Sequence, residues 1–70
     1  MFSIVLRKAD QTRRYSVSAL ADSGWEVVRE YEAEAPHHVC YRDWHRVERA
    51  LAIFRLEVSE LTQRGWSVVH

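Results

Sequence analysis

Residues 43–65 read DWHRVERALAIFRLEVSELTQRG, and in this stretch the apolar residues recur at the period of an α-helix. Asp43 is a good N-cap because its carboxylate can accept a free backbone N–H, and Gly65 can take the left-handed conformation that ends a helix. The apolar residues between them are Trp44, Val47, Leu51, Phe54, Val58 and Leu61. The sequence therefore predicts one helix of about six turns that presents this stripe to a sheet.

Outside the helix the sequence alternates with a period of two, which is typical of strands with one buried face. The predicted strands are residues 2–7, 13–20, 25–32 and 66–70. Residues 21–24, Ala-Asp-Ser-Gly, favour a turn that joins two of these strands in a hairpin. Pro36 then breaks the pattern, and residues 37–42 fit either a further short strand or an extended lead-in to the helix.

The order of these elements predicts one small α+β domain over residues 1–70. We expect an antiparallel sheet of three to four strands packed on one long helix in the C-terminal half. A chain of 70 residues with 47% hydrophobic content can bury one core and no second one. The expected core consists of Tyr15, Val17, Trp25, Val27, Leu51, Phe54, Val58 and Leu61.

Charge and hydropathy narrow the classes of function. Ten basic and ten acidic residues give a formal net charge of zero, so no overall field attracts nucleic acid or an anionic membrane. The apolar runs are far shorter than the roughly 20 residues of a membrane span. Cys40 is the single cysteine and cannot form an internal disulfide, which favours a reducing compartment. We expect a cytoplasmic protein without membrane contact.

One series of motifs resembles the layout of a known family. The motifs are Tyr15-x-Val17, Gly24-Trp25-x-Val27-Val28-Arg29, a helix with Ala50, Phe54 and Leu61, and Arg64-Gly65-Trp66. Their order is similar to that of WGR-type domains, some of which bind DNA, and of other small bacterial ββαβ domains. The Trp-Gly-Arg tripeptide itself is absent, and Tyr31-Glu32-Ala33 stands in its place. The resemblance therefore implies a topology and carries over no DNA-binding residue.

Four potential ligands of soft metals lie within nine residues: His37, His38, Cys40 and His45. Compact zinc modules pair their ligands at short spacing on two separate elements, and this spacing differs from theirs. We interpret the segment as a polar loop with surface imidazoles and expect no cofactor. The sequence also lacks a Gly-rich phosphate loop and a nucleophile elbow, so we expect no enzymatic activity.

Arginines next to aromatic residues form a candidate nucleic-acid surface. These arginines are Arg13, Arg14, Arg42 and Arg46. Proteins that bind single-stranded nucleic acid use aromatic rings interleaved with guanidinium groups. Tyr15 and Trp44 are close to these arginines in the sequence. The neutral total charge opposes such binding, so any affinity should be weak and sensitive to salt.

The back of the helix suggests a protein partner instead. Ile53 and Leu56 point away from the centre of the stripe, with Ala52 beyond them and Arg49 beside them. A two-layer fold offers these side chains no internal partner. We therefore hypothesise a non-catalytic protein-interaction module that binds a partner or self-associates as a weak homodimer through this surface. A weak nucleic-acid-binding module is the alternative.

The ligand spacing generates a prediction about zinc. Treatment with EDTA should leave the dispersion of the amide NMR spectrum unchanged, because no metal contributes to folding. A structural zinc would contribute folding energy outright, so collapse of the dispersion on chelation would contradict the interpretation.

Overall fold

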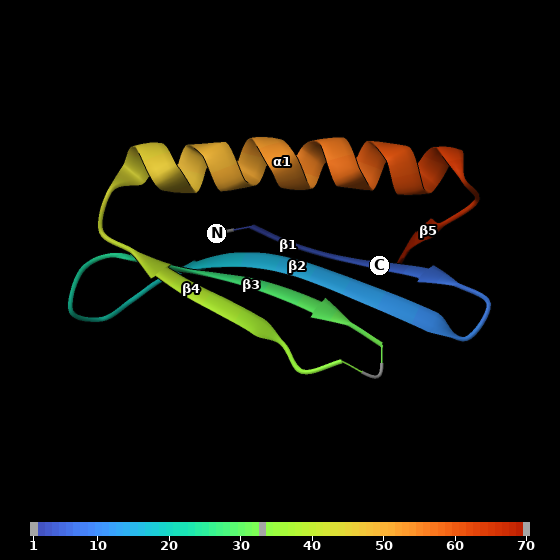
Figure 1. Ribbon diagram of the computed structural model, residues 1–70, viewed down its shortest axis with the longest axis horizontal. Helices are drawn as coiled ribbons and strands as arrows, with labels where there is room; N and C mark the ends of the chain where they lie inside the picture. Colours follow the sequence, from blue (N-terminus) through green and yellow to red (C-terminus); the bar gives the residue numbers. More distant parts are fainter. Residues whose placement is uncertain (1, 33, 70) are drawn as a thin grey trace.

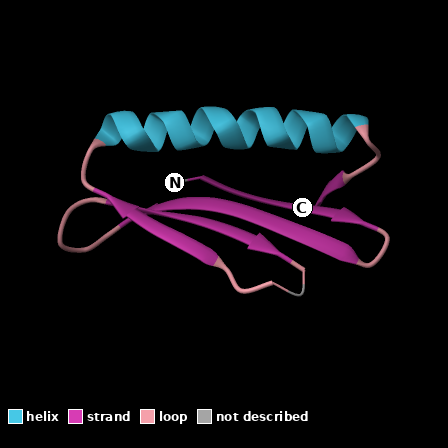
Figure 2. Cartoon of the chain, viewed as in Figure 1, coloured by secondary structure: helices cyan, strands magenta, loops and turns pink. Residues whose placement is uncertain are grey.

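The computed structural model describes residues 2–32 and 34–69, which form five strands and one helix. In chain order these are β1 (Phe2–Lys8), β2 (Gln11–Ala19), β3 (Trp25–Tyr31), β4 (His37–Tyr41), α1 (Trp44–Gln63) and β5 (Ser67–Val69). The strands make one antiparallel sheet in the order β4-β3-β2-β1-β5. The helix runs along one face of this sheet (Figures 1 and 2). The predicted α+β class and the long helix in the C-terminal half are confirmed.

The expected number of strands was wrong, because the sheet has five rather than three to four. Residues 37–41 form a true strand, in which Val39 lies opposite Val27 of β3. The β-forming residues Val39 and Tyr41 lie within this strand, which begins directly after Pro36, a residue that cannot donate a ladder hydrogen bond. At the other edge β5 pairs with β1, with Val68 opposite Leu6. His70 of the predicted closing strand lies outside the described residues.

The hairpin between β2 and β3 closes as its sequence predicts. Ser23 and Gly24 both have positive φ, 87° and 100°, and the Leu20 N–H donates to the Gly24 carbonyl at 3.0 Å. A Cβ on Gly24 would lie 2.9 Å from the Tyr41 carbonyl oxygen, closer than a carbon atom can approach without a shift of the backbone. Only glycine fits this position, since it satisfies both the left-handed backbone and the contact with the end of β4.

Both predicted helix ends are confirmed. The Asp43 side chain accepts a hydrogen bond from the His45 N–H at 3.0 Å. At the other end Gly65 has a φ of 99°, and the Trp66 N–H donates to the Leu61 carbonyl at 3.0 Å. These bonds satisfy backbone groups that a helix terminus leaves free, so the helix begins and ends where local sequence directs it.

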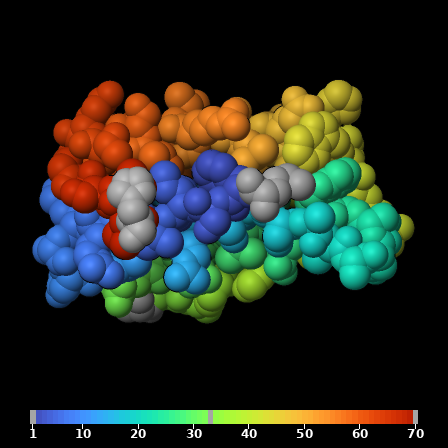
Figure 3. Space-filling model, turned by 180° about the vertical axis from the view of Figure 1, so that it is seen from behind, coloured from blue at the N-terminus to red at the C-terminus, as the bar shows by residue number. Residues whose placement is uncertain are grey.

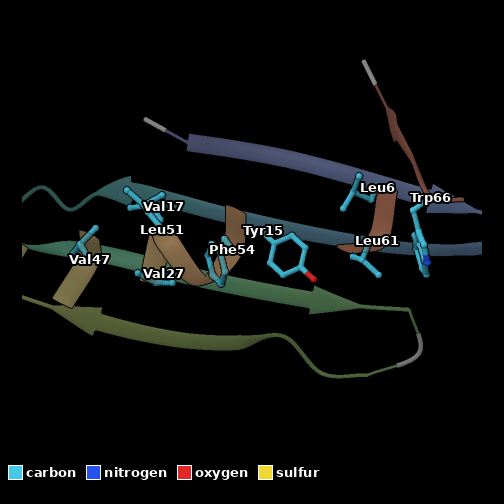
Figure 4. Close-up of a cluster of buried hydrophobic side chains, with 9 residues drawn as sticks. All are labelled: Leu6, Tyr15, Val17, Val27, Val47, Leu51, Phe54, Leu61 and Trp66. Carbon is cyan, nitrogen blue, oxygen red and sulfur yellow. The ribbon is translucent and has the colours of Figure 1, made fainter. Parts of the chain in front are cut away.

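The core lies between the sheet and α1. Its nine buried side chains, drawn in Figure 4, are Leu6, Tyr15, Val17, Val27, Val47, Leu51, Phe54, Leu61 and Trp66. Trp25 and Val58 were expected here and are only half-buried, whereas Leu6 was not expected. Trp44, the first residue of the predicted stripe, is 38% exposed and packs on Trp25 with 5.1 Å between ring centroids. The buried side chains of the helix therefore extend from Val47 to Leu61, and its first residue lies outside the core.

The two flanks of the helix differ. On the β1 flank, Phe2 and Ile4 pack against the core, and the space-filling view shows the helix and this strand closed against each other (Figure 3). On the β4 flank, Val39 stays 44% exposed although it faces the helix side of the sheet. The helix therefore lies over β3 and reaches both β2 and β4, but it leaves Val39 of β4 partly uncovered.

The packing around Phe54 generates a stability prediction. This ring is 3% exposed and lies 4.9 Å from the Tyr15 ring and 6.5 Å from the Phe2 ring, measured between centroids. Phe54→Ala should lower the free energy of unfolding by about 3–5 kcal/mol, most of what a domain of this size has. Urea unfolding measures the loss.

The matched control is Ser59→Ala at an exposed position of the same helix, which should change stability by less than about 0.5 kcal/mol. A Phe54→Ala cost no larger than the control's would contradict this description of the core.

Candidate functional site

An open groove lies between β4 and α1, and we call it the β4–α1 groove. One of its two cavities has a volume of about 330 Å³. The lining residues are Val27, Arg29, Tyr31, His37, Val39, Tyr41, Ala50, Ile53 and Phe54. A second cavity of about 340 Å³ shares Tyr41, Ala50 and Ile53 and extends the groove along the helix to Arg46 and Arg49. The groove is therefore mainly apolar, with arginines toward the N-terminal half of α1.

Strand alternation builds one wall of the groove and helix periodicity builds the other. His37, Val39 and Tyr41 occupy alternate positions of β4 and so share the face of the sheet that α1 occupies. Ile53 lies on the flank of α1 that faces them and is 45% exposed. Tyr41 packs partly against the core, whereas Val39 and Ile53 remain nearly half exposed at the rim of the groove.

An ion pair lies beside the inner end of the groove. Arg29 of β3 donates from Nη2 to Oε1 of Glu57 at 2.9 Å, and about a third of each side chain is exposed. The Arg29 guanidinium also lies 5.4 Å from the centroid of the Phe54 ring. Its Nε and the second Glu57 oxygen, Oε2, are buried without a hydrogen-bond partner among the described residues. The pair neutralises its own charge but leaves hydrogen-bonding capacity unused.

Tyr15 adds a third polar group under the helix. Its side chain is fully buried, and its hydroxyl has no hydrogen-bond partner among residues 2–32 and 34–69. Burial raises the pKa of this phenol far above its ordinary value, and the neighbouring Glu57 carboxylate raises the pKa further. The phenol therefore stays neutral and cannot serve as a base at physiological pH.

The outer edge of β4 is open. Within the described part of the chain β4 pairs only with β3, so half of its backbone N–H and C=O groups point away from the sheet. Edge strands are usually protected by proline, lysine or a bulge. The residues His37–Tyr41 contain neither proline nor lysine and stay in register with β3 throughout. An unprotected strand edge therefore borders the apolar groove.

Only part of the predicted partner surface lines the groove. Ile53 and Arg49 line the cavities of the groove, and Leu56 is 68% exposed one turn further along the helix. Ala52 is exposed but lines neither cavity. Sequence reasoning missed the β4 wall, although the alternation of His37, Val39 and Tyr41 after Pro36 was the signal that could have identified it.

The four predicted nucleic-acid arginines do not share one surface. Arg13 packs between two rings, 4.7 Å from the Tyr31 centroid and 5.0 Å from the Trp66 centroid. Its neighbour Arg14 points to the opposite face of the sheet. Arg42 and Arg46 lie beyond the other end of the strands, roughly 20 Å away along β3. The structure thus brings Arg42 and Arg46 together near the helix start and separates them from the other two.

The imidazoles and the thiol also fall on different faces. His37 faces the helix side of β4, whereas His38 and the exposed Cys40 face the other side, and His45 lies in the first turn of α1. His38 Nδ1 lies 3.2 Å from Oε2 of Glu26. No group of three or more His, Cys, Asp or Glu residues in the described ranges could hold a metal ion.

Comparisons of this chain with family models, with curated proteins and with solved structures give no match. The resemblance to WGR-type domains therefore stays a prediction. Among the described residues no helix has the length and apolar character to cross a membrane.

The buried phenol generates a prediction for high pH. Because the folded state holds the Tyr15 proton more tightly, the stability it contributes is full below about pH 10, the value of an unfolded tyrosine, and falls as the pH rises above it. Tyr15→Phe should remove this loss. At neutral pH the variant should be as stable as the wild type or more so, since the deleted hydroxyl has no partner.

Urea unfolding at several values of pH from 7 to 11 measures both effects. Parallel stability profiles for the wild type and Tyr15→Phe would contradict the assignment.

Proposed function

We propose that this protein is a non-catalytic interaction module that binds a protein segment in extended conformation at β4. The observation that carries the proposal is the position of an unpaired strand edge beside an apolar groove. Addition of a strand would satisfy the outward backbone groups of β4, and side chains of the new strand would enter the groove. Val39 and Ile53, both nearly half exposed, would then be covered.

The chemistry of the groove supports binding over catalysis. Arg29 and Glu57 pair with each other, and the Tyr15 phenol stays protonated. The exposed Cys40 lies on the other face of β4, so the thiol does not line the groove. The groove therefore presents contact area and a few polar atoms rather than a nucleophile with its base.

The alternative of nucleic-acid binding draws on a smaller part of the surface. Arg46 and Arg49 line the second cavity of the groove and could contact phosphate, and Arg42 lies near the helix start. Tyr41 borders the same cavity and offers a ring for stacking. Arg13 and Arg14 are too far away to extend this patch, so it could contact only a few phosphates.

Photo-crosslinking in the native cells tests the proposal. A photoreactive amino acid replaces Ile53 in the groove and, as a matched control, Ser59 on another flank of the same helix. Irradiation should yield protein adducts from position 53 that nuclease does not remove, and few from position 59. Val39→Lys should abolish the adducts from position 53, because a lysine on an edge strand disfavours strand addition.

Two results would overturn this function. Equal adducts at positions 53 and 59 would mean that the groove is not the binding surface. Adducts that disappear with nuclease would favour the nucleic-acid alternative instead.

A further inference from the structure

The flank of α1 that borders the groove has a pattern centred on Ile53. Arg49 lies four residues before Ile53 and Glu57 four residues after it. Arg46 and Glu60 lie seven residues before and seven residues after it. The apolar residues Ala50 and Leu56 lie three residues before and three residues after Ile53. Reversal of the helix direction about Ile53 therefore exchanges each of these two arginines with one of the two glutamates.

These residues share one side of the helix. At 100° per residue they fall within an arc of roughly 120° centred on Ile53. Arg46, Arg49 and Glu60 are exposed, and Glu57 is partly exposed. The arc borders the cavities that Ile53, Ala50 and the two arginines line. The pattern thus belongs to the same surface as the open strand edge.

Three of these four charged side chains form no ion pair among the described residues. The ion pairs among the described residues are Arg29 with Glu57 and His38 with Glu26. Arg46 and Glu60 are about 21 Å apart along the helix, so they cannot pair within one chain. Their complementarity can act only between two molecules.

A two-fold axis perpendicular to the sheet would use the strand edge and the helix flank together. It sets β4 antiparallel to β4 of a second copy, and it sets the two helices antiparallel on the same side of the joined sheet. Val39 and Ile53 line one cavity, so an axis that passes beside Val39 also passes close to Ile53. Arg46 then faces Glu60 of the second copy, and Arg49 faces its Glu57.

We propose that the extended segment bound at β4 is β4 of a second copy of this chain, in a two-fold dimer centred on Val39 and Ile53. This inference rests on the proposed function and names its partner. The interface is self-complementary in shape, because one strand edge pairs with its own copy. It is also self-complementary in charge, because the basic half of each helix flank faces the acidic half of the other.

Charge exchange between Arg46 and Glu60 tests the dimer. Sedimentation velocity at low ionic strength measures the dissociation constant of the wild type and of three variants. Arg46→Glu and Glu60→Arg should each weaken the dimer about tenfold, since each creates two like-charge contacts across the axis. The double variant should recover wild-type association within about threefold.

A mixture of the two single variants provides a sharper readout. A heterodimer of Arg46→Glu with Glu60→Arg again places opposite charges across both contacts, so the mixture should associate more tightly than either variant alone. A purely structural role of either residue would not produce this recovery. Both positions are exposed, and unchanged far-UV circular dichroism verifies that each variant folds.

The outcomes separate this inference from the proposed function. A wild type that stays monomeric up to about 1 mM, or a double variant as weak as the single ones, overturns the dimer. Crosslinks from position 53 to a different protein, with a monomeric wild type, also overturn the dimer but leave the interaction module standing. Absence of both crosslinks and dimers overturns both proposals.

Discussion

A helix with its side chains is about 10–12 Å wide, whereas four strand spacings of about 4.8 Å make a five-stranded sheet nearly 20 Å wide. Within the described residues α1 is the only helix, so it can cover about half of one sheet face. Phe2 and Ile4 fill the space on the β1 flank, and Trp66 closes the end near β5. On the β4 flank Tyr41 packs partly against the core, but Val39 stays exposed. The open groove is a direct result of this difference in width.

The features that could be predicted are those in which neighbouring residues carry the signal. Gly24 and Gly65 each end one element just before a tryptophan, and the apolar period defines α1. The alternation in β3 also places Arg29 on the helix side of the sheet. Its partner Glu57 is 28 residues further along the chain, and no local pattern connects the two. Half of the site was predictable because Ile53 belongs to the helix, whereas the β4 wall depends on how α1 lies across the sheet, which no local pattern defines.

The core of this small domain is completed by charged side chains as well as apolar ones. Arg13 lies between the rings of Tyr31 and Trp66, and the Arg29 guanidinium lies near the ring of Phe54. A guanidinium is flat and weakly hydrated, so it can stack on a ring and keep its hydrogen bonds at its edge. Lysine lacks this shape. Nine of the ten basic residues are arginine, and at these two positions the structure gives the preference a physical reason.

The pairing of β5 with β1 has a consequence for how the chain folds. Strands β1 to β4 form a meander in which each strand pairs with the next, so their contacts form over short loops. Val69 pairs with Val5, which was synthesised long before it. We expect a chain leaving the ribosome to form the meander first, with its apolar face bare until α1 emerges. The sheet is then completed last, by a three-residue strand that the helix carries back across the domain.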